Sequence, residues 1–441
     1  MSDTELLVVG AGFSGTMLAI NHLRLGVGDV TLVDEPDSIG RGLAYARSAS
    51  HHLLNVRSGR MSAHPDDPGH FTNWLAARGI ADGEGFASRR IYGDYLRATL
   101  DATAAKVGDR LRIVNARAVS AYRTAGRWSV SLTDGGRITA TKLVLALGNL
   151  PPDAPFPFAD ADLSVGVYCN DPWNAAIGDG LRLQDTVVLL GTGLTMIDTA
   201  LLLKQSGFGG RIVAISRRGL LPRAHAAGAA HAQGMEGFDA LPLSRRVQHL
   251  RRRADEIGWR DAVDELRPIT QPLWRDSAFE TRDRFLRHLR PWWDVHRHRV
   301  APSIEARVEH LRSEGGLEVI AAKTMSAVRD DDGARITYRC RGANETTDLT
   351  ARRIVNCTGP SGDIGRSNDP LLRHLLANGV VRADAHRLGI EVDDRQGVVA
   401  RDGIAWSDLW AVGPIARGNI WEMTAVPDLR SQAAAMARVV A

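Results

Sequence analysis

The strongest constraint on the fold is a glycine-rich turn between an apolar run and a helical segment, which occurs twice. The first copy, Gly10–Gly15 (GAGFSG), follows the apolar run Leu6–Val9. The second copy, Gly191–Met196 (GTGLTM), follows Thr186–Leu190. Short apolar runs of this kind are typical of strands buried on both faces of a parallel sheet. The chain is therefore predicted to contain two strand–helix–strand units.

The first unit has the features of a dinucleotide site. Its spacing predicts a helix over Thr16–Leu25 and a strand over Val30–Val33. In such a turn the first glycine allows the tight bend, the second lets a pyrophosphate approach, and the third lets the helix pack on the strand. An acid after the second strand binds the ribose, and free N–H groups at the helix start attract phosphate. The predicted site residues are Gly10, Gly12, Ser14, Gly15, Asp34 and Glu35. The alternative is a glycine-rich turn without a ligand.

The second unit differs at the end of its second strand. The predicted strand Arg211–Ile215 is followed by Ser216 and two arginines instead of an acid. Arginine at this place accommodates a 2′-phosphate and favours NADP over NAD. Met196 replaces the third glycine, so the helix is expected to lie further from its strand. The predicted site residues are Gly191, Gly193, Thr195, Ser216, Arg217 and Arg218. The alternative for the arginines is a solvated turn in an arginine-rich protein.

Three further apolar runs end in small turns, as strands do where they leave a sheet beside a cofactor. These turns add Gly148, Asn149, Gly359 and Gly413 to the predicted cofactor-binding residues. Two dinucleotide sites in one chain favour a flavin held by one domain and reduced by a nicotinamide held by the other. The predicted fold class is α/β with two Rossmann-like domains. The first is discontinuous (1–160 and 350–441), and the second (161–349) includes a helical insertion at about 222–312.

Composition excludes several other classes of protein. The three cysteines, Cys169, Cys340 and Cys357, form no CxxC pair, which argues against a disulfide framework, a cysteine zinc site or a dithiol redox centre. His296 and His298 lack the spacing of a metal site, so no metal is expected. The net charge is +4, and arginines alternate with acids, so no nucleic-acid partner is expected. Without an 18-residue apolar stretch, no membrane partner is expected either. We expect a cytoplasmic protein; the sequence does not indicate its oligomeric state.

Several of these segments together resemble the bacterial FAD/NAD(P)-binding oxidoreductases, over nearly the whole chain. The resemblance rests on Gly10–Gly15, Leu145–Pro152, Gly191–Asp198, Ser216–Gly219, Asn356–Pro360 and the insertion segment Arg287–Asp294. More distant relatives are the flavin-containing and N-hydroxylating monooxygenases. The resemblance implies FAD at the first turn and NADPH at the second. Leu53–Val56 is similar to the segment in which those monooxygenases place an asparagine beside the flavin, which makes Asn55 the predicted catalytic residue.

Two departures from these relatives leave the reaction open. The monooxygenase fingerprint FxGxxxHS is absent, and Pro414 follows Gly413 where disulfide reductases carry an aspartate. The leading hypothesis is a monooxygenase in which NADPH reduces FAD, O₂ forms a C4a-peroxyflavin, and a nitrogen or sulfur of a small substrate, such as an amino acid, is oxygenated. The first alternative is an NADPH-dependent flavin reductase or oxidase. The second is an NADPH-sensing flavoprotein that binds a partner.

Overall fold

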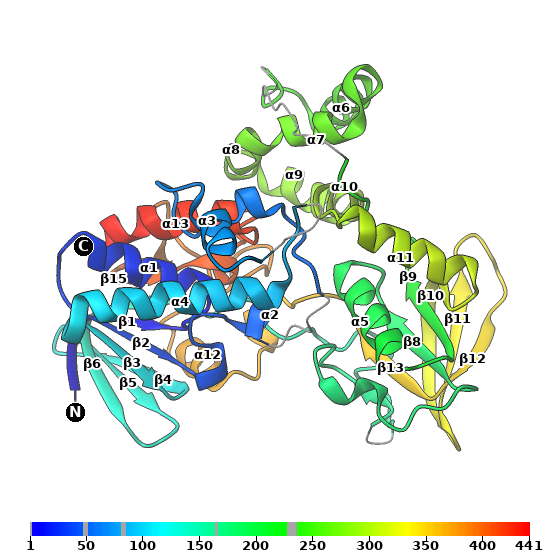
Figure 1. Ribbon diagram of the computed structural model, residues 1–441, viewed down its shortest axis with the longest axis horizontal. Helices are drawn as coiled ribbons and strands as arrows, with labels where there is room; N and C mark the ends of the chain where they lie inside the picture. The colour runs from blue at the N-terminus through cyan, green and yellow to red at the C-terminus, as the bar shows by residue number, and fades with distance from the viewer. Residues whose placement is uncertain (1, 47–51, 81–84, 164–165, 227–234, 236) are drawn as a thin grey trace. The chain divides into compact units, whose positions relative to one another are not determined.

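The computed structural model describes residues 2–46, 52–80, 85–163, 166–226, 235 and 237–441. The chain divides into two compact units (Figure 1). Unit 1 comprises Met1–Leu150, Thr270–Asp276 and Ser361–Ala441, and unit 2 comprises Pro151–Ile269 and Ser277–Pro360. The chain therefore passes from one unit to the other four times.

Unit 1 is built on an eight-stranded sheet. Its main path runs β14-β15-β6-β1-β2-β3, and β5 and β4 continue from β6 as an antiparallel pair. The five strands from β15 to β3 are parallel. The strands are β1 (Ser2–Val9), β2 (Val30–Asp34), β3 (Leu111–Asn115), β4 (Ala118–Thr124), β5 (Arg127–Leu132), β6 (Arg137–Leu145), β14 (Gly397–Val399) and β15 (Ala405–Ala411). The helices are α1 (Phe13–Arg24), α2 (Leu43–Ala46), α3 (His70–Ala76), α4 (Arg89–Val107), α8 (Thr270–Arg275), α12 (Pro370–Ala377) and α13 (Val426–Val439).

The central strand β1 carries apolar side chains on both faces, because both faces are covered. Leu6 and Val8 pack into a core with α1, α4 and α13, which lie along one face of the sheet in Figure 1. Leu7 and Val9 pack into a second core with α12 and the β4–β5 pair. This arrangement explains the unbroken apolar run in the sequence.

Unit 2 repeats the parallel core in a seven-stranded sheet of order β12-β11-β10-β9-β8-β13-β7. The strands from β10 to β7 are parallel, and β11 and β12 are antiparallel. The strands are β7 (Tyr168–Cys169), β8 (Thr186–Leu190), β9 (Arg211–Ser216), β10 (Leu317–Asp330), β11 (Gly333–Cys340), β12 (Thr347–Ala351) and β13 (Arg353–Asn356). The helices are α5 (Leu194–Gln205), α6 (Leu243–Ile257), α7 (Trp259–Glu265), α9 (Phe279–Arg284), α10 (Arg290–Arg297) and α11 (Pro302–Ser313).

The region expected to be a helical insertion contains α6 to α11, and its residues 227–234 and 236 lie outside the described part of the chain. One helix of this region, α8, belongs to unit 1. Trp274 anchors it there: the buried indole stacks on Trp421 with ring centroids 4.5 Å apart, and its Nε1–H donates to the Gly418 carbonyl at 2.8 Å. The helix α11 leads into β10, which extends the parallel sheet beside β9.

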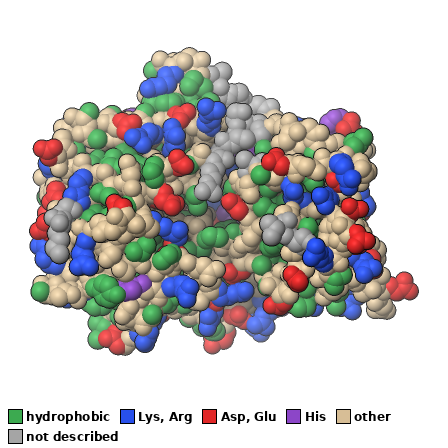
Figure 2. All heavy atoms as spheres, turned by 90° about the horizontal axis from the view of Figure 1, so that it is seen from below, with side chains coloured by type: hydrophobic (Ala, Val, Ile, Leu, Met, Phe, Trp, Pro, Cys, Tyr) green, Lys and Arg blue, Asp and Glu red, His purple; other side chains and the backbone are tan. Residues whose placement is uncertain are grey.

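Surface charge is mixed in sign. On the face shown in Figure 2, basic and acidic side chains are interspersed, and no large area of one sign appears. Many arginines are paired with acids, as Arg123 is with Asp408 and Arg382 with Glu391. Across the residues that the structure describes, no helix combines the length and the apolar character needed to span a membrane.

The sequence-predicted elements around both turns are confirmed. The strand predicted over Thr186–Leu190 has these bounds in the structure, and a helix follows each turn. The helix predicted over Thr16–Leu25 spans Phe13–Arg24, so it begins inside the glycine turn, and the helix after the second turn begins at Leu194. The final helix, α13, begins at Val426 and carries Pro427 in its first turn, a position that proline favours. Tyr92 and Tyr95 of α4 are fully buried.

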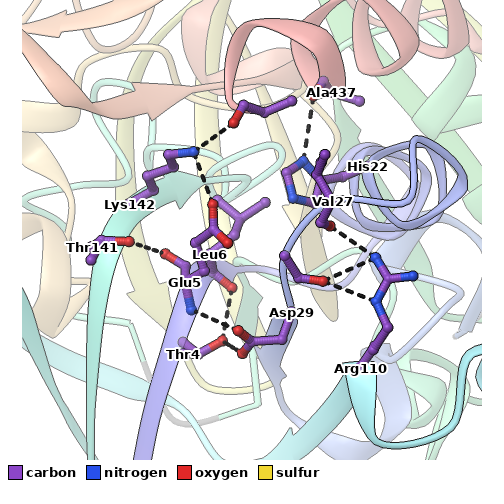
Figure 3. A network of polar contacts seen from close by, with 12 residues as sticks. Thr4, Glu5, Leu6, His22, Val27, Asp29, Arg110, Thr141, Lys142 and Ala437 are labelled. Atoms are coloured by element: carbon purple, nitrogen blue, oxygen red, sulfur yellow. Dashed lines mark hydrogen bonds and ion pairs between the residues drawn. The ribbon is translucent and has the colours of Figure 1, made fainter.

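A network of polar contacts lies at the amino-terminal edge of the unit 1 sheet (Figure 3). Lys142 donates to Glu5 at 3.1 Å and to the Ala441 carbonyl at 2.9 Å. Nearby, His22 on α1 is completely buried, and its Nδ1 lies 3.4 Å from the Ala437 carbonyl of α13. Because the glycine turn lies at the opposite, carboxyl edge of β1, we assign this network a structural role.

The burial of His22 predicts acid sensitivity. Burial lowers the pKa of His22, so the unfolded chain binds a proton at this histidine at a higher pH than the folded chain does. The free energy of unfolding should therefore fall as the pH drops below about 6.5, the ordinary histidine value. Urea unfolding at about pH 7 and about pH 5 should show a smaller loss in His22→Leu than in the unsubstituted protein. His64, whose pKa burial lowers to about 4, stays in the variant and retains its own share. Equal losses in both proteins would contradict the assignment.

Candidate nucleotide-binding sites

In the first glycine turn, neighbouring backbone atoms leave little room for side chains. Gly10 has φ +99°, and a Cβ atom there would overlap the carbonyl oxygen of Ala146, just after β6. A Cβ atom on Gly15 would overlap the carbonyl oxygen of Gly10. Gly12 precedes α1 in an extended conformation, and its Cβ would lie 3.4 Å from the Cα of Gly42. Two of the three glycines are thus required by the fold of the turn, and Gly12 stands at the start of the helix, where a phosphate would be held.

The second turn reproduces the first. Gly191 has φ +104°, and its Cβ would overlap the carbonyl oxygen of Cys357, just after β13. The Gly191 N–H donates to the Ile215 carbonyl at 2.8 Å, and the Gly10 N–H donates to the Val33 carbonyl at 2.9 Å. Nothing lies within 4 Å of a Cβ built on Gly193, so the space in front of α5 is open.

The two turns differ at the end of the neighbouring strand. In unit 1, Asp34 ends β2, and its carboxylate accepts the N–H groups of Ala11 at 2.7 Å and Glu35 at 2.8 Å. Burial raises the pKa of Asp34, while Glu35 is exposed. Asp34 is thus tied to the turn itself, and Glu35 offers a solvent-facing carboxylate beside it. Each Asp34 oxygen has a second lone pair with which to accept from a ribose.

In unit 2 the equivalent strand end carries hydroxyls and cations. Ser216 ends β9; its Oγ lies 2.9 Å from Thr192 Oγ1 and accepts the Gly219 N–H at 3.0 Å. Arg217 is exposed and Arg218 is half-buried. Neither arginine forms a hydrogen bond or ion pair with any residue that the structure describes. Two guanidinium groups beside the turn are therefore available to an anionic ligand.

A loop that the sequence analysis missed packs on the first turn. The Gly40 N–H donates to the Ala11 carbonyl at 2.8 Å, and Gly42 lies against Gly12. Gly40 and Gly42 have φ +77° and +63°, a conformation that favours glycine. Between them, Arg41 pairs with Asp94 of α4 at 2.8 Å. The sequence feature from which this loop could have been predicted is the pair of glycines that follows the Asp34–Glu35 strand end.

The remaining predicted residues lie at strand ends and in one loop. Gly148 and Gly359 follow β6 and β13 with φ +67° and +88°, and Asn149 is exposed. Thr195 is half-buried in the first turn of α5. Gly413 follows β15, and a Cβ there would lie 2.5 Å from Ser14 Oγ. The structure thus places Gly413 directly beside the first turn.

Asn55 lies in a loop of unit 1 that is held by several hydrogen bonds to neighbouring segments. The N–H groups of Leu54 and Ser58 donate to the carbonyls of Ala87 at 2.9 Å and Gly85 at 2.7 Å. Further along, the Ser62 carbonyl accepts from Arg430 of α13 at 2.9 Å. Asn55 itself is half-buried. The loop is therefore ordered and is connected to the first half of α13.

Each unit offers a phosphate-binding turn of the kind that dinucleotides use. The glycines leave no side chain over the start of either helix, and the strand ends carry polar groups of the kind that bind a ribose in such sites. These residues fit FAD in unit 1 and a pyridine dinucleotide in unit 2. Within the described residues, no cluster of three or more histidine, cysteine or acidic side chains could hold a metal ion.

Comparisons with known proteins agree with this geometry. Residues 7–150 match a domain family described as FAD-NAD(P)-binding. No sequence among curated proteins matches the chain. Among solved structures, ornithine hydroxylase from Pseudomonas aeruginosa has a TM-score of 0.69 at 16% identity, over 99% of this chain and 98% of that chain. L-lysine 6-monooxygenase from Pseudomonas syringae has a TM-score of 0.66 at 16% identity, over 99% of both chains.

Thioredoxin reductase from Lactococcus lactis is less similar, with a TM-score of 0.55 at 12% identity over 99% of this chain and 97% of that chain. At these identities the likeness establishes the fold, and it extends over the whole chain. The predicted α/β fold with two Rossmann-like cores is thus confirmed. Residues 7–150 of this chain belong to the FAD-NAD(P)-binding domain family.

Proposed function

We propose that the protein is an FAD-dependent monooxygenase that uses NADPH and O₂ to hydroxylate the nitrogen of a small amine, such as an amino acid or a diamine. Unit 1 binds FAD and unit 2 binds NADPH. The reaction consumes one amine, one O₂, one NADPH and one proton, and yields the hydroxylamine, NADP⁺ and water. When bound, FAD supplies the redox chemistry that links NADPH to O₂.

The observation that carries this proposal is the pair of equivalent turns with different strand ends. Gly10 and Gly191 sit in the same backbone geometry, each beside a parallel strand and a helix N-terminus. Asp34 stands at the end of one unit's strand, and Ser216, Arg217 and Arg218 stand at the end of the other's. Two nucleotides of different chemistry fit this difference: a ribose at Asp34 and a 2′-phosphate at the arginines.

The chain's own residues bind, orient and shield the reactants. The helix N-termini of α1 and α5 hold the pyrophosphates through backbone N–H groups. Asn55 acts at the flavin as a hydrogen-bonding group, a role suggested by the resemblance to the monooxygenases. Arg287, in the helical segment 285–289, pairs with Asp283 at 2.9 Å, and Arg290 of α10 pairs with Asp294 at 3.5 Å, so each already has an acidic partner and is a poor candidate for holding a substrate carboxylate.

The likeness to the hydroxylases supports the oxygenating reaction over the alternatives. Ornithine hydroxylase superposes with a TM-score of 0.69, against 0.55 for thioredoxin reductase. An NADPH-dependent reductase or oxidase is the second candidate, favoured by the absence of the FxGxxxHS fingerprint of the monooxygenases. Its product with O₂ alone is hydrogen peroxide, formed in equal amount to NADP⁺.

The two reactions are separated by their products. Purified protein loaded with FAD should oxidise NADPH, and a panel of amino acids and diamines should include one that raises the rate and yields a hydroxylamine. Mass spectrometry with ¹⁸O₂ should find the labelled oxygen in that product. NADPH oxidation that gives only hydrogen peroxide with every amine in the panel would favour the oxidase.

Substitution of Asn55 tests its assigned role. Asn55→Ala should leave FAD bound and should lower the fraction of NADPH oxidation that yields hydroxylamine by about 10-fold or more, the size of a lost catalytic hydrogen bond. The remainder should appear as hydrogen peroxide, measured with a peroxidase assay. Ser431→Ala, at an exposed position on α13 outside the predicted site, is the control and should leave the product fraction unchanged. An unchanged product fraction in Asn55→Ala would contradict a catalytic role.

A further inference from the structure

The end of β15 touches the first glycine turn. The Val412 N–H donates to the Leu145 carbonyl of β6 at 3.0 Å, and Gly413 then turns away with φ +78°. A Cβ atom on Gly413 would lie 2.5 Å from Ser14 Oγ in the first turn of α1. The buried backbone of Gly413 therefore packs directly against the first turn of α1, beside the predicted pyrophosphate site.

A buried glutamine holds this backbone in place. Gln432 of α13 is 6% exposed, and its Oε1 accepts the Gly413 N–H at 2.9 Å. Its Nε2 donates to Gln396 Oε1 at 2.6 Å. Pro414 has no N–H, so the Gly413 N–H is the one donor of this dipeptide, and Gln432 occupies it.

Gln396 adopts a conformation that glutamine rarely adopts. Its φ is +62°, in the left-handed region that favours glycine. Its N–H donates to the Asp393 carbonyl at 2.9 Å, and its carbonyl accepts the Ala411 N–H at 3.2 Å. This conformation places the Gln396 side chain within reach of Gln432. Here that side chain orients the carboxamide of Gln432.

Unit 2 fixes the corresponding strand end with another buried carboxamide. There β7 pairs with β13 as β15 pairs with β6, and Asn170 follows β7. Asn356 is completely buried and donates to Asn170 Oδ1 at 2.8 Å and to the Asp153 carbonyl at 2.9 Å. Each unit thus uses an internal amide side chain beside its glycine turn, although the two residues come from different elements.

We propose that Gln432, oriented by Gln396, is a positioning residue for the flavin nucleotide. It fixes Gly413 against Ser14, at the place where disulfide reductases of this fold carry an aspartate and this chain has Pro414. The inference rests on the proposed binding of FAD by unit 1. Without the Gln432 carboxamide, the Gly413 peptide loses its partner and is free to rotate away from the turn.

Gln432→Met tests this role, because methionine has a similar length and lacks the hydrogen bonds. The dissociation constant for FAD, measured by quenching of flavin fluorescence, should rise about 10-fold. The dissociation constant for NADP⁺ should stay unchanged. Ser431→Ala, at an exposed position on the same helix, should bind both as the unsubstituted protein does. Asn356→Leu should leave FAD binding unchanged, since it alters the other unit. Thermal unfolding of each apoprotein separates altered binding from altered folding.

A double-substitution cycle tests the coupling to Gln396. Gln396→Ala keeps the backbone conformation and removes the acceptor of Gln432, so it should weaken FAD binding on its own. In Gln432→Met it should have little further effect. Unchanged FAD binding in Gln432→Met, or additive effects in the pair, would overturn the inference. If Gln432→Met does not fold, Gln396→Ala alone decides: unchanged FAD binding there would also overturn it. Failure of the unsubstituted protein to bind FAD would refute the proposed function itself.

Discussion

Gly193→Val is expected to abolish reduction by NADPH while the protein keeps FAD. Gly193 has φ −84° and ψ −164°, an extended conformation that valine adopts readily, and nothing lies within 4 Å of its Cβ position. The apoprotein should therefore fold normally. The valine methyl groups would fill the space in front of α5 where the pyrophosphate approaches the backbone. Losing two charge-assisted hydrogen bonds there, at about 1.5–3 kcal/mol each, would weaken NADPH binding by about 100-fold or more.

Gly12→Val is the matched variant in unit 1. Its Cβ would lie 3.4 Å from the Gly42 Cα, so the Gly40–Gly42 loop must shift slightly, and FAD should be lost. The two variants serve as controls for each other: bound FAD is measured from absorbance after gel filtration, and NADPH binding from fluorescence titration. A Gly193→Val protein that lost FAD and kept NADPH would reverse the assignment of the two turns.

The parts of these sites that could be predicted from sequence are those that depend on local backbone geometry. Gly10 and Gly15 are required because a Cβ atom at either position would overlap backbone atoms of the turn or of the segment beside it. This requirement is visible in the sequence as the spacing of the glycines. A helix after each turn follows from the same local pattern, but its exact start does not: α1 begins at Phe13, three residues before the predicted Thr16. Sequence alone could not choose between Asp34 and Glu35, because the choice depends on which residue ends β2 and reaches the Ala11 N–H.

The parts that could not be predicted depend on contacts between distant residues. The Gly40–Gly42 loop reaches the first turn across the end of β2, and Gln432 meets Gly413 and Gln396 through the packing of α13 on the sheet. The docking of α8 onto unit 1 rests on Trp274 meeting Trp421 and Gly418. None of these pairs has a periodic or motif-like signature, since each side chain alone is an ordinary polar or aromatic residue.

Replacing Arg217 and Arg218 with alanine should change the coenzyme preference. Both arginines follow Ser216 at the end of β9, and neither pairs with any residue that the structure describes. A 2′-phosphate on the ribose would be their counter-ion, whereas NADH offers only hydroxyls at that place. The double variant should therefore bind NADPH about 10- to 100-fold more weakly, the range for a charge-assisted hydrogen bond, with NADH binding nearly unchanged.

Arg211→Ala is the control that separates a specific contact with the 2′-phosphate from a general effect of positive charge on coenzyme binding. Arg211 begins β9 at the opposite edge of the sheet and pairs with Glu318, so Arg211→Ala removes one positive charge far from the turn. Its NADPH and NADH affinities should both stay unchanged. The NADPH affinity of the unsubstituted protein should fall with added salt more steeply than that of the double variant, because screening acts on the phosphate–guanidinium contact. If the double substitution weakened NADPH binding and NADH binding equally, Arg217 and Arg218 would be ordinary residues of a solvated turn. A preference for the phosphorylated coenzyme would then have to arise from other residues.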